Sequence, residues 1–210
     1  MPGRRPAQQS PGRRPAQQSD VREDLVAAAE HLLMDAGLAG ATSRKIALAA
    51  GTTVASVNYH FGSKDGLISV VVGNHMVPLM ENLVGALKEG STIDPDRPVE
   101  SILHQYAETF LINCLEDPIL REAMGVLYSN PQLADRWNRE NIYPFTEPLV
   151  DLLHEHMPGL SHAEVRRRFQ LFYESVSGQT INRMNAQTKD DAREKLDAFI
   201  AFITPAFLAD

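Results

Sequence analysis

Residues 41–67 read ATSRKIALAAGTTVASVNYHFGSKDGL, and the rest of the chain is best interpreted from this stretch. Within it, Gly51 interrupts a run of small and apolar residues that has helical character. Thr53 is typical of a helix start, and after it Val57 and Phe61 lie one turn apart on the same helical face. Two short helices joined at a glycine, the second with small and polar residues on its free side, predict a helix-turn-helix.

The same stretch is poor in acidic side chains, although the protein as a whole is acidic. The chain has 27 Asp and Glu residues against 20 Lys and Arg residues, for a formal net charge of -7. From Ala36 to Lys64 there is no carboxylate, whereas Arg44 and Lys45 are present. Because carboxylates repel phosphates, this window is where a nucleic-acid backbone can approach the protein.

Size and composition are those of a globular protein. With 210 residues the chain can bury a core in one large or two small domains. Its single cysteine, Cys114, cannot form an internal disulfide, which suggests a reducing compartment. No apolar run reaches the roughly 18 residues that span a bilayer, and the N-terminus lacks the apolar segment of a secretory signal. We therefore expect a cytoplasmic protein without a membrane partner.

The N-terminal tail repeats itself. Pro2–Ser10 reads PGRRPAQQS, and Pro11–Ser19 repeats it letter for letter. Without large apolar residues, residues 1–19 are expected to form a disordered basic tail. The arginines could reach neighbouring DNA, but a duplication without a role is the favoured interpretation because arginine pairs are common in such tails.

The rest of the chain reads as helical, and we expect an all-α fold of roughly nine helices. Order should begin at Asp20, with a first helix that ends at Gly37. A longer helix should run from Ser63 to about Lys88, with a kink or break at Pro78. Further helical periodicity covers Glu100–Cys114, Pro118–Tyr128, Pro131–His156, Ser161–Asn185 and Lys189–Leu208.

The motif T-S-R-x-I-A-x-x-A-G followed by V-N-Y-H-F-G-S-K-x-G-L resembles the head of the TetR (tetracycline-repressor) family of bacterial regulators. The resemblance extends from Asp20 to about Val72, and beyond it only the helical pattern and the length fit the family's variable body. It implies a three-helix DNA-binding head at residues 20–67 and a helical effector-binding and dimerisation domain at residues 68–210.

The resemblance also implies a set of DNA contacts. Helix N-termini direct N–H groups at phosphates, and the first side chains of a recognition helix reach into the major groove. The expected contacts are Ser43 and Arg44 before the turn, Thr53, Val54, Ala55 and Ser56 in the first turn of the recognition helix, and Asn58, Tyr59, His60 and Lys64 at its end and just beyond.

Some of these positions have alternatives that stay open. Thr53 could be a helix cap only, and Arg44 could belong to a solvated face. Asn58 stands where many family members have tyrosine, and an asparagine can read adenine through two hydrogen bonds. Gly66 stands where glutamate is common, which should weaken the following helix start. Since Val54 offers only apolar contacts, DNA shape should carry much of the specificity.

The resemblance implies a homodimer through the last two helices, although an ordinary core would give a similar sequence pattern. It also implies a small-molecule effector, which the apolar residues of the middle helices suggest is hydrophobic or amphipathic. Core packing is the alternative for each candidate pocket residue, and the candidates are Phe110, Cys114, Met124, Tyr128 and Trp137.

Enzymatic and metal-binding motifs are lacking. His154 and His156 would point to different sides of a helix, His162 lies beyond a loop, and one cysteine does not make a closed zinc site. We expect no cofactor, no metal and no catalysis. The favoured hypothesis is a ligand-responsive dimeric repressor that binds a palindromic double-stranded DNA operator. The alternatives are an architectural DNA-binding protein without an effector and, more remotely, an enzyme with a vestigial head.

Overall fold

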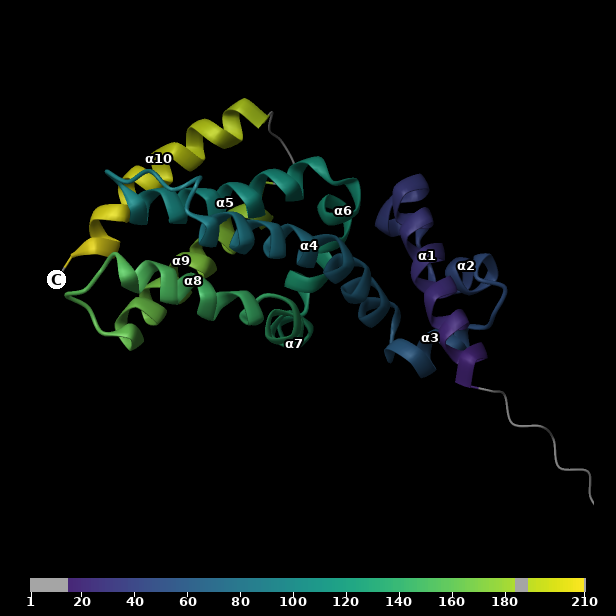
Figure 1. Ribbon diagram of the computed structural model, residues 1–210. Helices are drawn as coiled ribbons and strands as arrows, with labels where there is room; N and C mark the ends of the chain where they lie inside the picture. Colours follow the sequence, from purple (N-terminus) through teal and green to yellow (C-terminus); the bar gives the residue numbers. More distant parts are fainter. Residues whose placement is uncertain (1–14, 184–188, 210) are drawn as a thin grey trace, which may run out of the picture.

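The protein is all-α. Its computed structural model describes residues 15–183 and 189–209, which form ten helices and no strand. The helices are α1 Pro15–Gly40, α2 Ser43–Ala49, α3 Val54–Phe61, α4 Lys64–Glu89, α5 Pro98–Glu116, α6 Pro118–Ser129, α7 Pro131–Asn141, α8 Tyr143–Glu155, α9 His162–Arg183 and α10 Lys189–Leu208. We call α1–α3 the head and α5–α10 the body; α4 connects them, and Figure 1 shows the head at one end of the molecule.

The tenth helix arises from a break that the sequence analysis did not place. A single helix was predicted over Pro131–His156, whereas α7 ends at Asn141 and α8 begins at Tyr143. Pro144 lies in the first turn of α8, where a missing N–H costs nothing. In an uninterrupted helix the same ring would clash with the carbonyl one turn earlier, so the proline separates the two helices.

The head packs around fully buried side chains from each of its helices, namely Leu25, Leu33, Ile46 and Val57. Gly37 was predicted to end the first helix; it interrupts α1 with φ 61° and ψ -174°, and a last helical turn follows it. The helix begins at Pro15, earlier than the expected Asp20, and the preceding part of the duplicated tail lies outside the described residues.

Helix α4 is the central element of the fold. Its 26 residues include a window with a mean hydropathy of 1.3, so by length and composition alone it could cross a membrane, contrary to the expectation from the sequence. That window is 56% buried inside the protein, as in a core helix. Met76 and Met80 are among its fully buried side chains. The helix continues through Pro78 instead of ending there.

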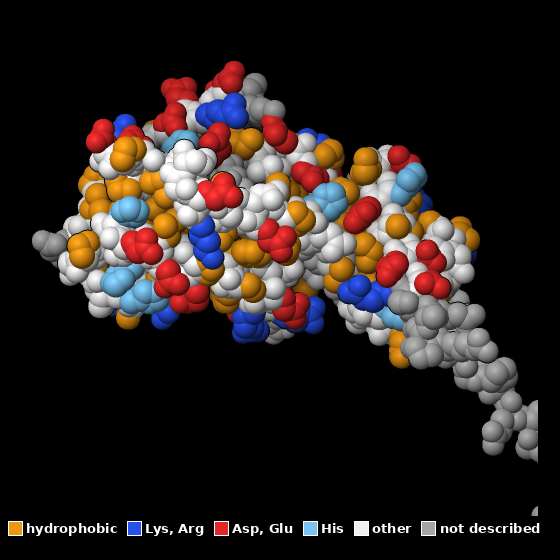
Figure 2. Space-filling view, viewed as in Figure 1, with side chains coloured by type: hydrophobic (Ala, Val, Ile, Leu, Met, Phe, Trp, Pro, Cys, Tyr) orange, Lys and Arg blue, Asp and Glu red, His pale blue; other side chains and the backbone are white. Residues whose placement is uncertain are grey.

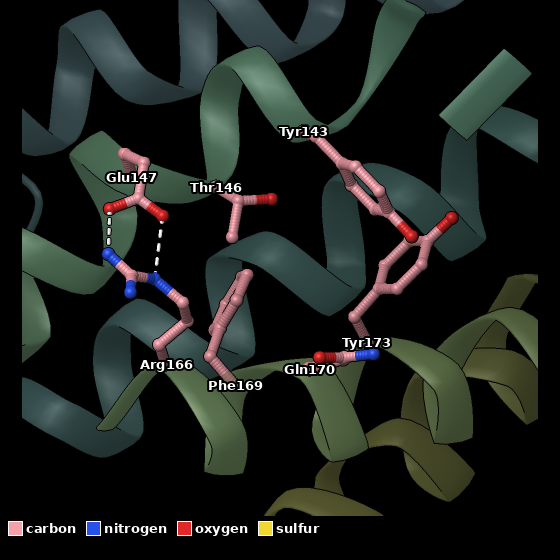
Figure 3. Close-up of a pocket in the computed structure, with 7 residues that line it drawn as sticks. All are labelled: Tyr143, Thr146, Glu147, Arg166, Phe169, Gln170 and Tyr173. Atoms are coloured by element: carbon pink, nitrogen blue, oxygen red, sulfur yellow. Dashed lines mark hydrogen bonds and ion pairs between the residues drawn. The ribbon is translucent and has the colours of Figure 1, made fainter. Parts of the chain in front are cut away.

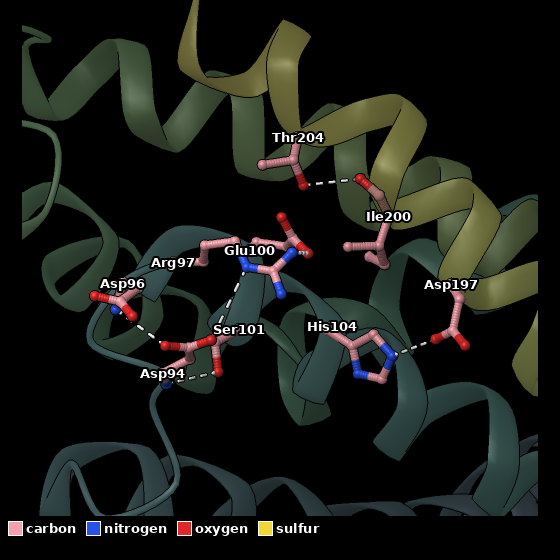
Figure 4. A network of polar contacts seen from close by, with 9 residues as sticks. All are labelled: Asp94, Asp96, Arg97, Glu100, Ser101, His104, Asp197, Ile200 and Thr204. Carbon is pink, nitrogen blue, oxygen red and sulfur yellow. Dashed lines mark hydrogen bonds and ion pairs between the residues drawn. The ribbon is translucent and has the colours of Figure 1, made fainter.

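The body is held together by an aromatic cluster and by polar contacts to α10. The ring centroids of Tyr106 and Phe169 are 5.2 Å apart, and Phe172 stacks on Phe199 of α10 at 6.1 Å. His104 Nε2 of α5 lies 2.8 Å from Asp197 Oδ1 of α10, within the network of Figure 4. Helix α10 is thus fixed along α5, at the side of the body seen in Figure 1.

Candidate nucleic-acid interface

The turn between α2 and α3 is fixed by backbone hydrogen bonds and one glycine. Gly51 has φ 62°, a conformation that strains other residues, and this allows the chain to reverse. The N–H of Thr52 donates to the carbonyl of Ala47 at 2.8 Å, which closes the turn. Helix α2 itself begins after Thr42, whose hydroxyl accepts from the N–H of Lys45 at 3.3 Å.

The first turn of α3 is held by three hydroxyl groups. Thr53 Oγ1 accepts from the N–H of Ser56 at 3.4 Å and is therefore a helix cap. Ser56 Oγ lies 2.8 Å from Thr52 Oγ1 and 3.2 Å from Thr53 Oγ1. The Ser56 hydroxyl is thus directed at the turn, while the Thr53 cap leaves its side chain exposed for a further contact.

None of the ten predicted DNA-contact positions is buried. The buried side chains of α3 are Val57 and Phe61, which pack into the head as predicted for the motif core. The side chain of Tyr59 is 75% exposed. Arg44, Thr53, Val54, Ala55, Asn58 and Tyr59 are exposed, and Ser43, Ser56, His60 and Lys64 are half-buried.

Three aromatic rings lie next to one another at the end of α3, and the guanidinium of Arg22 packs against one of them. The rings of Tyr59 and His60 meet edge to face, with centroids 5.0 Å apart. The guanidinium of Arg22 in α1 lies 5.2 Å from the centroid of Phe61, a cation–π distance. Arg22 was missed by the sequence analysis, because nothing in its own helix indicates that it lies against the end of α3.

Gly66 has a packing reason that the sequence did not indicate. Ser63 caps α4 by accepting from the N–H of Gly66 at 3.0 Å. A Cβ at this position would overlap the carbonyl oxygen of Phe61, which is backbone and cannot move freely. Glycine therefore lets α4 begin directly against the end of α3. This packing role accompanies the low helix propensity of glycine, which weakens the start of α4. Lys64 follows the cap as the first residue of α4.

The charge of the head is uneven. Figure 2 shows Asp and Glu side chains on the visible face of both the body and the head, with Lys and Arg among them. In the sequence, the carboxylates of the head lie in α1, whereas α2 and α3 have none. The N-terminus of α3 therefore has the exposed side chain of Thr53 and no acidic group in its first turn, and helix N-termini favour anions such as phosphate.

Four of the five candidate effector residues lie in the core of the body. Phe110, Cys114 and Met124 are fully buried. Burial, together with the charge of Asp117, raises the pKa of the Cys114 thiol to about 12. Trp137 is 2% exposed, and its indole N–H donates to the carbonyl of Ser69 at 3.0 Å. The side chain of Tyr128 lies outside the described residues.

A cavity of about 280 Å³ lies elsewhere, between α8 and α9, and none of the four candidates with described side chains lines it. Figure 3 shows Tyr143 and Tyr173 at one end of it and the ion pair of Glu147 with Arg166 at the other. Phe110 packs behind the wall of the cavity, because the centroid of its ring lies 6.4 Å from that of Tyr173, which lines the cavity. No sequence pattern indicates this cavity, since its walls come from two separate helices.

The histidines considered for metal binding have other neighbours. The rings of His154 and His162 meet edge to face with centroids 5.4 Å apart. His162 Nε2 lies 2.8 Å from Asp151 Oδ1, and His154 Nε2 lies 3.1 Å from the carbonyl of Leu160. In the described part of the chain, no group of three or more His, Cys, Asp or Glu side chains is arranged to hold a metal ion.

Residues 25–71 match the family described as bacterial regulatory proteins, tetR family. The head of the chain is thus similar to the heads of tetR-family regulators. The match covers the helix-turn-helix and the first turns of α4, where the motif carrying the resemblance is found. Among curated protein sequences, none matches the chain.

Solved structures of low sequence identity share the fold of this chain. RolR in complex with resorcinol has a TM-score of 0.64 and 16% identity, over 89% of this chain and 88% of RolR. FadR of Bacillus subtilis in complex with stearoyl-CoA has a TM-score of 0.59 and 18% identity, over 89% and 97%. SmeT, the repressor of a Stenotrophomonas maltophilia multidrug efflux pump, has a TM-score of 0.52 and 22% identity, over 87% and 91%.

Proposed function

We propose that this protein is a dimeric transcriptional repressor that binds a palindromic operator through α3 and is released by a small molecule bound in the body. The observation that carries the proposal is the first turn of α3, where the Thr53 cap is fixed and Val54 and Ala55 are exposed beside it. In this proposal residues 20–67 recognise DNA, and residues 68–210 bind the effector and form the dimer.

Specific readout would combine a few side chains with the shape of the DNA. Asn58 is exposed on α3 and can make two hydrogen bonds to an adenine edge. Tyr59, His60 and Lys64 follow it and would contact the phosphate backbone. Arg22 is also exposed close to this end of α3 and would add positive charge there.

The dimer would form through α9 and α10. Leu171 of α9 is 60% exposed and Phe202 of α10 is 77% exposed, so both helices present large apolar groups to solvent. Ser175, one turn after Leu171, is small and exposed, which lets a second helix approach closely. A two-fold axis at this face would place two copies of α3 toward successive major grooves.

Release requires that the effector favours a conformation that binds DNA poorly, and typical couplings of this kind are about 1–3 kcal/mol. Relatives with the same fold include FadR with stearoyl-CoA and RolR with resorcinol, which supports an apolar or aromatic effector here. SmeT is a repressor, which supports repression over activation.

Selection of bound sites from random duplex DNA tests the proposal. A palindrome with two half-sites about one helical turn apart is the expected result. Enrichment without sequence preference would favour an architectural protein, and no enrichment would refute DNA binding. The control carries both Arg44→Ala and Lys64→Ala, which leave the buried residues of α3 unchanged and should recover less DNA of every sequence.

A further inference from the structure

The cavity between α8 and α9 has the features of a small binding site. One end is aromatic, with Tyr143 of α8 beside Tyr173 of α9 (Figure 3). Phe169 lies in the middle of the cavity, between the two tyrosines and the ion pair of Glu147 with Arg166. Thr146 adds a hydroxyl and Gln170 an amide to the same walls. The volume of about 280 Å³ is near the lower end of ligand pockets, which suits a molecule smaller than a typical drug.

The two charged side chains at the other end of the cavity, Glu147 and Arg166, neutralise each other in an ion pair. Arg166 Nε donates to Glu147 Oε1 at 2.7 Å, and its Nη2 donates to Glu147 Oε2 at 2.5 Å. The guanidinium thus engages both carboxylate oxygens, the geometry in which these two groups pair most strongly. A charged ligand would have to separate this pair, whereas a neutral ligand would leave it intact.

The cavity would stay open in the proposed dimer. Successive residues of a helix point about 100° apart, so Gln170 and Leu171 face different directions. Gln170 lines the cavity, whereas Leu171 belongs to the exposed apolar face of α9 proposed for dimerisation. Pairing of α9 and α10 with a second copy therefore leaves the α8 side of α9 accessible.

We propose that this cavity binds a neutral, hydroxylated aromatic molecule of one or two rings, and that this molecule is the effector. The inference rests on the proposed function, because it gives the repressor its ligand class and its binding site. Flat rings stack on the two tyrosines, and the ligand hydroxyls exchange hydrogen bonds with Thr146 and Gln170.

Contacts lead from this cavity to the head. The hydroxyl of Tyr173 donates to Asn138 Oδ1 of α7 at 2.7 Å. The neighbouring Trp137 donates to the carbonyl of Ser69 in α4 at 3.0 Å. One turn further along α7, Asn141 lies so close to α4 that a Cβ at position 73 would be 2.6 Å from its Oδ1. A ligand that displaces Tyr173 would therefore shift α7, and a shift of α7 would move α4, the helix that begins next to α3.

Titration calorimetry with β-naphthol, a neutral two-ring phenol, tests the site on the full chain. Binding is expected for the unmodified protein and should weaken by about tenfold or more in Tyr143→Ala, which loses one aromatic wall at an exposed position. Gln132→Ala, at an exposed position of α7 outside the cavity, should bind as the unmodified protein does. Naphthalene sulfonate, an anion with the same rings, should bind more weakly than β-naphthol.

A second measurement follows release of the selected operator by β-naphthol. Tyr173→Phe keeps the ring but loses the hydrogen bond to Asn138, so it should bind β-naphthol and release the operator less than the unmodified protein. The inference is overturned if β-naphthol does not bind, if Tyr143→Ala binds it equally, if the anion binds more tightly, or if Tyr173→Phe releases the operator in full. Absence of any operator binding before β-naphthol is added would instead refute the proposed function.

Discussion

Replacing Gly37 with alanine tests how the head is fixed to the body. Gly37 interrupts α1 with φ 61° and ψ -174°, a combination that is essentially restricted to glycine. The next residue, Leu38, donates its N–H to Glu122 Oε2 of α6 at 3.4 Å. A Cβ at position 37 would stand 3.0 Å from the same carboxylate oxygen, so Gly37→Ala both strains the backbone and crowds this contact.

The expected loss follows from these contributions. Holding alanine in this conformation costs about 1–3 kcal/mol. Displacing the Glu122 carboxylate forfeits one long, exposed hydrogen bond, about 0.5 kcal/mol. Alanine restricts the unfolded chain more than glycine does, which offsets about 0.4–1 kcal/mol. The free energy of unfolding should therefore fall by about 0.5–3 kcal/mol.

Urea unfolding followed by circular dichroism measures this loss. Gly125→Ala is the matched control, because it lies in α6 with open space around its Cβ position. It should leave stability unchanged or raise it by up to about 1 kcal/mol. Gly37→Ala combined with Glu122→Ala should keep most of the loss, since the backbone strain remains. Equal stability of Gly37→Ala and the unmodified protein would refute this account of the α1–α6 contact.

Other predictions concern α3, the start of α4 and the buried thiol. Thr53→Ala removes the cap of α3 and should lower the free energy of unfolding by about 1 kcal/mol in urea titrations. His60→Ala and Lys64→Ala should weaken binding to all DNA sequences in fluorescence anisotropy and flatten its salt dependence, whereas Asn58→Ala should relax preference at one base position. Because burial raises the pKa of Cys114 from 9.0 to about 12, the folded thiol should react slowly with iodoacetamide at neutral pH. Between pH 9.0 and about pH 12 the thiol ionises in the unfolded chain but not in the folded protein. The free energy of unfolding of the unmodified protein should therefore fall with rising pH more steeply than that of Cys114→Ala.

Each of these predictions has an outcome that contradicts it. Unchanged stability in Thr53→Ala would mean that the long hydrogen bond at 3.4 Å contributes nothing. Equal losses on selected and random DNA for Asn58→Ala would assign this side chain to the backbone. A fast reaction of folded Cys114, at the rate of the unfolded chain, would show that α5 opens readily.

The head could be predicted closely because its signals are local. The Thr53 cap and the Gly51 reversal each depend on a few neighbouring residues, and the structure has both. The need for glycine at position 66 could not be predicted, since it arises from the carbonyl of Phe61 packing against the next helix. Arg22 was missed for the same kind of reason, because its contact with Phe61 joins two helices.

The body was less predictable, because its site depends on how helices pack. Apolar periodicity identified buried residues such as Phe110 and Met124, but periodicity does not distinguish a core from a cavity wall. The cavity is formed by polar and aromatic residues such as Tyr143 and Tyr173, which are far apart in the sequence. Even the division of α7 from α8 depends on whether Pro144 begins a helix or interrupts one.

Sequence-specific binding through α3 is tested by comparing the affinity of the protein for the selected operator and for a scrambled duplex of the same length over a series of salt concentrations. A sequence-specific repressor should bind the operator about a thousandfold more tightly or better at physiological salt, while both affinities fall as salt rises. Equal affinities for the two duplexes, or affinities that do not depend on salt, would contradict a sequence-specific repressor that contacts DNA through α3.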